Sequence, residues 1–195
     1  MTQGPVARAA ELARHALRDD GDPRVRAAAL GALVRAGRSE DALRAWRASV
    51  VDTAAGVRRR AAELAPALAT NPTIAPELMS LLDDRDVTVV EAAAWALGEF
   101  GQSAIDADAV TSLARVVHDH RDGLAREAAV AALGALGDPA GLPAVLAACS
   151  DRVAVRRRAV LALAPFSGPD VDAALAHALD DKDWQVRQAA EDLTT

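Results

Sequence analysis

The residues best suited to chemistry in this sequence form a histidine–acid cluster, and their surroundings do not support a metal site. His118, Asp119 and His120 follow one another, but no second cluster of Cys or His supplies further ligands for zinc. They also stand where a predicted helix runs into a turn, a place at which the helix dipole favours histidine. The sequence therefore predicts no bound metal.

Nucleophilic and acid–base chemistry are equally poorly supported. Cys149 is the only cysteine, and it falls on the apolar stripe of a predicted helix, which favours a packing thiol over a nucleophile. The acid pairs Asp83–Asp84 and Asp180–Asp181 stand at repeat junctions, where helix ends explain them better than general acid–base catalysis. No Ser/His/Asp arrangement, phosphate-binding glycine loop or dinucleotide motif occurs. We therefore expect a protein without catalytic activity and without a cofactor.

The composition favours closely packed helices and a partner other than nucleic acid. Hydrophobic residues make up 51% of the 195 residues and aromatics only 3%, so the apolar surface is mostly Ala, Leu and Val. The formal net charge is −6, and Lys182 is the only lysine. Arginine runs at 58–60 and 156–158 spread around their helices, because successive helical residues point about 100° apart. With few aromatics to stack on bases, nucleic acid is not the expected ligand.

No segment indicates export or insertion into a membrane. Arg8, Glu11 and Arg14 interrupt the N-terminal stretch, which leaves no apolar core of the signal-peptide kind. No apolar run approaches the roughly 20 residues that a membrane-spanning helix needs. We therefore expect a soluble, cytoplasmic protein.

The dominant feature of the sequence is an internal repeat. A Val, replaced once by Ala, recurs at intervals of 30 to 36 residues, at Val25, Val57, Val89, Ala125, Val155 and Val186. A leucine stands eight residues after four of these markers, and a glycine stands twelve residues after three of them. Agreement at several independent offsets indicates a true repeat of helical units.

Each unit divides into two helices with recognisable ends. In the third unit, Asp86 is placed to cap the first helix and Gly101 to end it in a left-handed conformation. Pro66 and Pro165 fall late in two first helices and are expected to end them early. We predict one repeat domain over 1–195, with a cap helix at 6–19, repeats at about 22–51, 52–83, 84–119, 120–150 and 151–180, and a half repeat at 181–195.

Two segments carry the clearest form of the repeat. Asp22 to Gly37 and Asp122 to Gly137 share the pattern Asp-x-x-Val-Arg, with Ala125 for Val in the second, followed by an alanine-rich helix ending in Gly. This pattern resembles the HEAT-like repeat family, particularly its short bacterial, bilin-lyase-type form. The resemblance covers nearly the whole chain. It implies an all-α, right-handed α-solenoid of about five helical hairpins with a single capping helix at each end.

The resemblance also implies a ladder of hydrogen bonds between Asp and Arg side chains of successive repeats. Five arginines stand one residue after the markers, at Arg26, Arg58, Arg126, Arg156 and Arg187. Their fixed place in the repeat favours this ladder over a phosphate-binding stripe. Val90 replaces Arg in the third unit, and Ala54 and Arg152 replace Asp before two first helices. We therefore expect a ladder that is interrupted near the middle of the chain.

Proteins that this pattern resembles are mostly interaction scaffolds whose second helices line a concave groove. We therefore expect a non-catalytic scaffold that binds a peptide or protein partner, of unspecified identity, through the concave helix face. A minority of the family act on alkylated DNA or attach bilins to antenna proteins. The alternative is thus a DNA-binding or DNA-glycosylase-like module, or a bilin-lyase-like accessory protein.

The predicted groove residues point away from the apolar stripes of the second helices. They are Arg44, Arg47, Glu77, Ser80, Thr111, Arg115, Ala144 and His177. In the fourth unit this surface is alanine, at Ala144, Ala147 or Ala148, which is small enough to admit an incoming backbone or helix. A mixed surface of this kind suits a peptide or protein ligand.

The three tryptophans are predicted to have different environments. Trp46 shares a helix face with Leu43 and Val50, so we expect it in the core. Trp95 lies well away from the apolar stripe of its helix, and Trp184 precedes the last helix. Exposed tryptophan is typical of interface hot spots, so Trp95 and Trp184 are candidate partner contacts.

Overall fold

The computed structural model describes residues 5–37, 40–71, 73–101 and 107–194, and these residues form twelve α helices and no strand. The chain divides into two compact units, residues 1–96 (unit 1) and 97–195 (unit 2). The division falls inside a helix and not in a loop between predicted repeats. The all-α solenoid predicted from the sequence is confirmed, whereas the single repeat domain stays a prediction.

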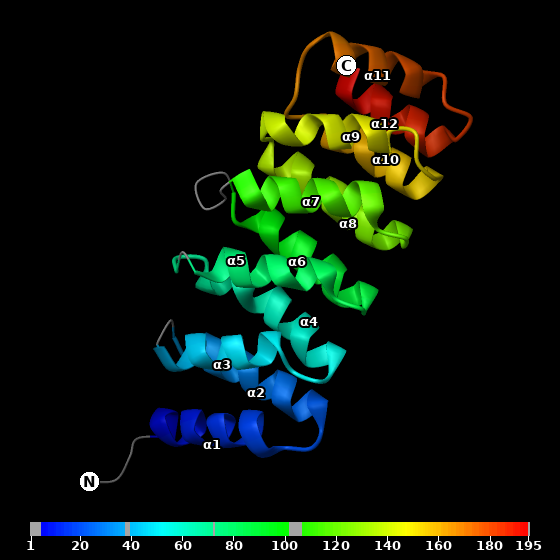
Figure 1. Cartoon of the computed structure of the whole chain (residues 1–195). Helices are drawn as coiled ribbons and strands as arrows, with labels where there is room; N and C mark the ends of the chain where they lie inside the picture. Colours follow the sequence, from blue (N-terminus) through cyan, green and yellow to red (C-terminus); the bar gives the residue numbers. More distant parts are fainter. Residues whose placement is uncertain (1–4, 38–39, 72, 102–106, 195) are drawn as a thin grey trace. The chain divides into compact units, whose positions relative to one another are not determined.

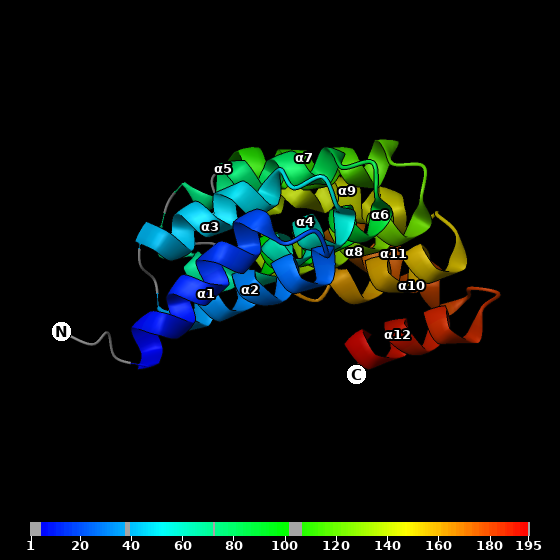
Figure 2. The same ribbon diagram turned by 90° about the horizontal axis from the view of Figure 1, so that it is seen from below.

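Unit 1 is built from two rows of helices (Figure 1). Its elements are α1 (Pro5–Asp19), α2 (Pro23–Ala36), α3 (Glu40–Val50), α4 (Ala55–Leu64), η1 (Ala65–Leu68), α5 (Ile74–Met79), η2 (Ser80–Asp83) and the first ten residues of α6 (Val87–Glu99). The first helices α2 and α4 pack on each other, and the second helices α3 and α5 do the same. Figure 2 shows α1, α3 and α5 along one side of the unit.

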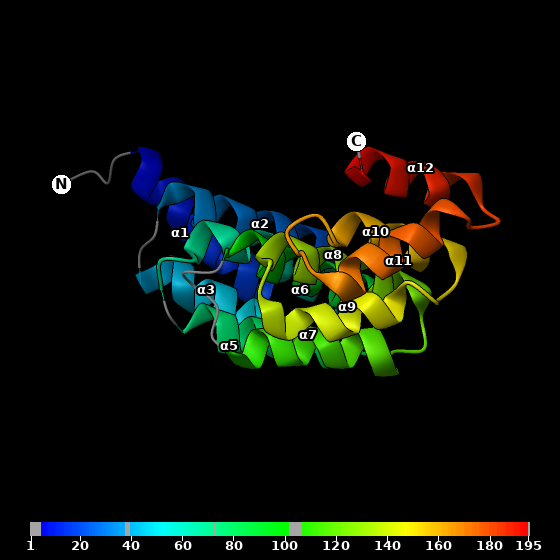
Figure 3. The ribbon, with the colours of Figure 1, turned by 90° about the horizontal axis from the view of Figure 1, so that it is seen from above.

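Unit 2 repeats this arrangement (Figure 3). It contains the end of α6, α7 (Ala107–Asp119), α8 (Gly123–Leu136), η4 (Pro139–Gly141), α9 (Leu142–Ala148), α10 (Val153–Ala162), α11 (Pro169–Leu179) and α12 (Trp184–Thr194). The first helices α8, α10 and α12 pack in sequence, and α9 packs against α7 and α11. A Cβ atom on Gly134 would lie 2.7 Å from the Ala162 Cα, so α8 and α10 approach as closely as glycine allows.

Local sequence explains where the helices begin and end. Four aspartates cap first helices by accepting the backbone N–H two residues later, at 2.9–3.0 Å; they are Asp22, Asp86, Asp122 and Asp183. Gly101 has a φ of +65°, as its predicted role as a helix terminator requires. Pro66 lies in the short 3-10 segment that follows the end of α4, and α10 ends at Ala162, before Pro165. The predicted early ends of both helices are confirmed.

Small and branched aliphatic side chains fill the core, as the composition predicts. In unit 1, Trp46 is fully buried, and its Nε1 donates a hydrogen bond of 2.7 Å to the carbonyl oxygen of Ala61. This bond joins the second helix α3 to the first helix α4. In unit 2, one cluster joins Val160 of α10 to Ala178 of α11 and to Val186 and Ala190 of α12. The core is therefore formed between successive helix pairs, as in other repeat proteins.

A ladder of paired Arg and Asp side chains joins the loops of unit 1. Arg26 donates from Nε and Nη2 to both carboxylate oxygens of Asp52, at 2.9 and 2.8 Å. Arg58 donates in the same way to Asp84, at 2.6 and 2.8 Å, and its Nη1 donates to the carbonyl oxygen of Asp52 at 2.8 Å. Each arginine thus ties the loop before its own helix to the loop after the next helix, and we call each Arg–Asp pair a rung.

Unit 2 contains two equivalent rungs. Arg126 pairs with Asp151 at 2.6 and 2.8 Å, and Arg156 pairs with Asp181 at 2.6 and 2.9 Å. The last arginine, Arg187, keeps only the contact to its own loop, from Nη1 to the Asp181 carbonyl oxygen at 2.7 Å. The predicted structural role of these arginines is therefore confirmed for four complete rungs.

The replacements at Ala54 and Arg152 do not interrupt the ladder. These residues occupy the helix-cap position, whereas the rung acid stands just before it, at Asp52 and Asp151. The expected loss at these two sites was wrong, because cap and rung use different aspartates. Val90 does replace a rung arginine. In the same repeat, the position of the rung acid is held by His120, whose Nδ1 accepts the N–H of Asp122 at 3.1 Å.

We predict that breaking a rung destabilises the chain far more than removing an exposed ion pair. The side chains of Arg58 and Asp84 are only 9% and 6% exposed, so Arg58→Ala strands a buried carboxylate and should cost about 3 kcal/mol. Arg59→Ala, which removes an exposed pair with Glu63, should cost less than about 0.5 kcal/mol. Urea unfolding monitored by circular dichroism compares the two. Equal losses would contradict a structural role for the ladder.

The ladder also predicts a specific sensitivity to acid. The hydrogen bonds from Arg156 lower the pKa of Asp181 from its ordinary value of 3.8 to about 2. Because the folded pKa is depressed, this pair stabilises the chain above about pH 4, and that stabilisation is lost as the pH falls towards 2. NMR titration of the Asp181 carboxyl carbon should show the low pKa. In Arg156→Leu, the pKa should return towards its ordinary value, and an unchanged titration would oppose this assignment.

Candidate functional site

The predicted groove residues lie on the second helices, divided between the two units. Arg44 and Arg47 lie on α3, Glu77 on α5 and Ser80 in η2, all in unit 1. Unit 2 contributes the rest: Thr111 and Arg115 on α7, Ala144 on α9 and His177 on α11. All but three of the eight residues are exposed; Arg47 and Glu77 are half-buried, and Ala144 is buried.

The structure corrects the prediction for the alanine surface of α9. Ala144 is only 2% exposed and Ala148 only 3%, because both pack into the core of unit 2. Ala147 is the exposed residue of the three. The sequence reasoning left three nearby alanines open, since alanines on a short apolar helix give little indication of which side faces the core.

Arg47 and Glu77 bind each other across neighbouring second helices. The Arg47 Nε donates to Glu77 Oε1 at 2.7 Å, and its Nη2 donates to Thr73 Oγ1 at 2.5 Å. The Arg47 and Glu77 side chains are 40% and 33% exposed. Their polar groups therefore link α3 to α5, and the more open surface lies on the other side of α3.

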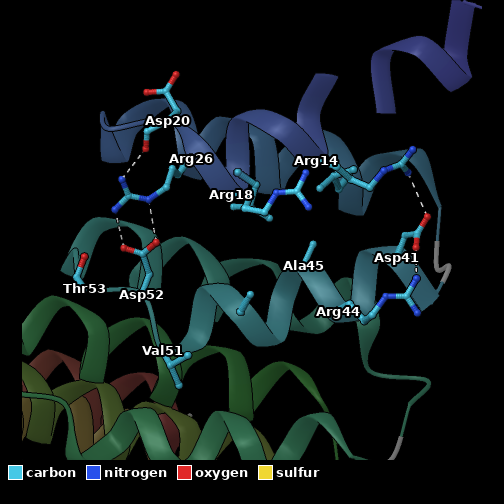
Figure 4. Close-up of a pocket in the computed structure, with 13 residues that line it drawn as sticks. Arg14, Arg18, Asp20, Arg26, Asp41, Arg44, Ala45, Val51, Asp52 and Thr53 are labelled. Atoms are coloured by element: carbon cyan, nitrogen blue, oxygen red, sulfur yellow. Dashed lines mark hydrogen bonds and ion pairs between the residues drawn. The ribbon is translucent and has the colours of Figure 1, made fainter. Parts of the chain in front are cut away.

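That open surface is a pocket between α1 and α3, with a volume of about 590 Å³ (Figure 4). We call it the α1–α3 pocket. Its apolar surface comes from five side chains: Leu17, Leu33, Ala45, Ala48 and Val51. Val51 is 78% exposed. An aliphatic side chain this exposed at the end of a second helix is unusual in this chain, because the equivalent positions in later repeats hold Asp83, Asp119, Ser150 and Asp180.

Arginines from both helices surround the apolar surface. Arg14 and Arg18 come from α1 and Arg44 from α3, and Asp41 accepts from both Arg14, at 3.1 Å, and Arg44. Figure 4 shows Arg14 and Arg44 converging on this one carboxylate. Arg18 extends between the helices, and its Nε donates to the neighbouring Asp19 at 3.3 Å.

The first rung of the ladder closes one end of the pocket. Arg26 and Asp52 both line it, as does Asp20, whose backbone carbonyl accepts from Arg26 at 3.0 Å. The Arg26 side chain lowers the pKa of Asp52, so this pair is fully ionised at neutral pH. The pocket therefore combines a largely buried ion pair at one end, exposed arginines along its sides and an aliphatic patch.

Unit 2 has a smaller pocket at the equivalent place, about 190 Å³ in volume, beside the Arg126–Asp151 rung. Val117, His118 and His120 line it from the α7 side, and Ala147 and Ala148 from α9. The histidines of the predicted cluster are thus next to a rung. Among the described residues, no group of three His, Cys, Asp or Glu side chains is arranged to hold a metal.

Sequence reasoning missed the α1–α3 pocket because α1 was treated only as a capping helix. Arg14 and Arg18 were not among the predicted site residues. The available signal was Val51, an apolar residue at a place where other repeats have an acid or serine. That exception becomes visible only when the repeats are aligned at the ends of their second helices, and not at the Val markers.

Other candidate residues have structural partners. Arg59 and Arg60 both bind Glu63, at 2.9 and 3.0 Å, which agrees with a spread-out arginine run. Burial raises the pKa of the Cys149 thiol to about 11, and its Sγ contacts the Val145 carbonyl oxygen at 3.5 Å. These features fit the packing thiol predicted from the sequence.

The two tryptophans predicted as hot spots are exposed. Trp95 on α6 is 49% exposed and Trp184 at the start of α12 is 64% exposed, whereas Trp46 is fully buried as predicted. Both exposed residues lie on first helices, away from the second-helix surface. Their part in binding a partner stays a prediction.

Comparisons with known proteins agree with the repeat architecture. The family model described as HEAT repeats matches residues 52–134 and 110–193, which together span most of the chain. The chain therefore belongs to the HEAT-repeat family. A search of curated proteins found no significant match. Within the described residues, no helix is both long enough and apolar enough to cross a membrane.

Solved structures with the same fold include designed and natural proteins. A designed armadillo repeat protein in complex with the peptide (KR)4 has 18% identity and a TM-score of 0.66, over 98% of each chain. An engineered protein has 21% identity and a TM-score of 0.67, over 97% of this chain and 96% of that one. The CpcE–CpcF complex of phycocyanin lyase from Nostoc sp. PCC7120 has 25% identity and a TM-score of 0.63, over 97% and 76%.

We predict that the three tryptophans contribute very unequally to stability. Trp46→Ala should cost about 4 kcal/mol, because it empties a core site and leaves the Ala61 carbonyl without its donor. Trp95→Ala and Trp184→Ala should each cost less than about 1 kcal/mol, since about half or more of each side chain is already in water. Thermal and urea unfolding measure these losses. Acrylamide should quench the emission of Trp95 and Trp184 but not that of Trp46.

Proposed function

We propose that this chain is a non-catalytic scaffold that binds a peptide segment of a protein partner on its second-helix surface, with the α1–α3 pocket as a principal contact. The observation that carries this proposal is the exposed aliphatic patch around Val51, flanked by arginines from two helices. A contiguous apolar patch rimmed by polar side chains marks an interaction site more often than a single exposed aliphatic residue does. Small apolar areas with convergent polar groups are typical of ligand sites.

The fold is suited to this role. Successive second helices present side chains at a regular spacing, and the rungs hold the helices in place before any ligand arrives. A preformed surface loses less entropy when it binds than a flexible one. The designed armadillo repeat protein of similar fold is in complex with a peptide, so an arrangement of this kind is able to hold one.

A nucleic-acid ligand fits the pocket less well. Asp20, Asp41 and Asp52 alternate with the arginines around the pocket, so it offers single anion sites and no continuous basic track for a chain of phosphates. Among the described residues, no aromatic side chain lines it to stack on a base. The identity with phycocyanin lyase raises a bilin-related role as an alternative, but no side-chain arrangement in the described residues favours it.

Val51→Asp tests the proposed surface, because it places in this repeat the residue that the next repeat has at Asp83. The position is exposed, so the free energy of unfolding should change by less than about 0.5 kcal/mol. Peptides selected on the wild-type chain from a displayed random dodecapeptide library should bind the variant about tenfold more weakly, measured by fluorescence anisotropy.

Leu12→Asp is the matched control, because Leu12 is 62% exposed on α1 and does not line the pocket. It should leave peptide binding unchanged. Enrichment of no peptide, or equal binding by the wild type and Val51→Asp, would overturn the proposed function.

A further inference from the structure

The arginines of the α1–α3 pocket have many donors that no protein acceptor uses. The side chains of Arg14, Arg44 and Arg18 are 44%, 66% and 73% exposed. A guanidinium carries five N–H donors, and Arg14 and Arg44 each direct one hydrogen bond to the shared Asp41. Arg18 also donates to Asp19 at 3.3 Å, and Arg44 lies 3.9 Å from Glu40. Most donors of the three arginines still have no acceptor among the described residues, so a second carboxylate could accept them.

Four arginines and three aspartates line the pocket, so arginine exceeds aspartate by one among its lining residues. Arg26 and Asp52 neutralise each other in the first rung. Asp20 accepts the backbone N–H of Asp22 at 2.8 Å, and Figure 4 shows its carboxylate directed away from Arg26 and Asp52. The other charges that line the apolar patch are three arginines and Asp41. Two acids outside the lining also pair with these arginines, Asp19 with Arg18 at 3.3 Å and Glu40 with Arg44 at 3.9 Å. A carboxylate would therefore be bound by the unused donors of these arginines and not by a large net charge.

The aliphatic patch restricts the ligand further. Val51, Ala48 and Leu17 lie in the same pocket as the arginines, so a ligand that fills it presents an apolar group beside a negative one. Neighbouring side chains of a peptide provide both groups. Arginine is suited to this recognition because its planar donors pair with carboxylates in a bidentate manner.

We propose that the α1–α3 pocket binds an acidic segment of a protein partner, with a Glu or Asp carboxylate held by Arg14, Arg18 and Arg44 and an adjacent apolar side chain placed on Val51. This inference rests on the proposed function and specifies the chemistry of the peptide. It assigns to this chain a ligand of opposite charge to the (KR)4 peptide of the designed armadillo repeat protein.

The equivalent pocket of unit 2 supplies an internal comparison. Arg14 and Arg18 precede Asp20 by six and two residues, and the residues at the same distances before His120 are Ala114 and His118. Asp41 and Arg44 precede Asp52 by eleven and eight residues, and the residues at the same distances before Asp151 are Ala140 and Pro143. The rung beside the pocket is retained, but the arginines are not. Binding of acidic segments is therefore expected in unit 1 alone.

Selection from the random dodecapeptide library on the full chain tests the proposal. The enriched peptides should contain Asp or Glu next to Leu, Ile, Val or Phe, and replacing their acids by Asn or Gln should weaken binding about tenfold. Arg18→Glu and Arg44→Glu should each weaken binding by about tenfold or more, whereas Arg44→Lys should retain part of it. Raising the salt concentration should also weaken binding, because the arginines are exposed.

Arg59→Glu serves as the charge-matched control, since Arg59 is 54% exposed on the first helix α4 of the same unit. It should leave the affinity unchanged, and circular dichroism should show that all variants remain folded. Enriched peptides without acids that still lose binding in Val51→Asp would overturn this inference while keeping the proposed function. Tighter binding of a single-stranded oligonucleotide through the same arginines would overturn both.

Discussion

The bidentate pairing of one arginine with one aspartate is the interaction on which the rest of the structure depends. A repeat made mostly of alanine, leucine and valine buries little side-chain volume per helix, so the relative placement of its helices needs a directional contact. Each rung supplies one, because the guanidinium holds two carboxylate oxygens and a backbone carbonyl together. The rungs are half-buried or more, which strengthens them relative to surface ion pairs.

The ladder also sets the limits of the candidate site. Arg26 and Asp52 form one end of the α1–α3 pocket, so the same pair that joins two loops gives the pocket a fixed, neutral wall. The variable residues are those next to it, namely the exposed positions of α1 and α3. Evolution of a binding site in such an array needs changes only at exposed positions, since the frame residues preserve the fold. The arginines and Val51 stand at positions of this kind.

The sequence predicted the frame well and the site only in part. Periodicity, caps and the markers predicted the helices, the roles of Gly101 and Pro66, and the rung arginines, because each of these depends on local contacts at fixed offsets. The burial of Ala144 was mispredicted because small residues on a helix give little indication of which one faces the core. The rungs at Asp52 and Asp151 were mispredicted because the rung acid and the cap position are close together in the chain, and the sequence does not show which of the two pairs with the arginine. The α1–α3 pocket depends on side chains from two separate helices. Its geometry could not be derived from either helix alone.

The rungs join residues that are close in the chain. Arg26 and Asp52 are 26 residues apart, and Arg126 and Asp151 are 25 apart. Proteins whose stabilising contacts are this local close only short loops when they fold, which speeds folding compared with architectures of distant pairings. Because the core forms between successive helix pairs, a few neighbouring hairpins with their rungs are the segment expected to form while later repeats are still being synthesised. Folding of this chain is therefore expected to proceed hairpin by hairpin.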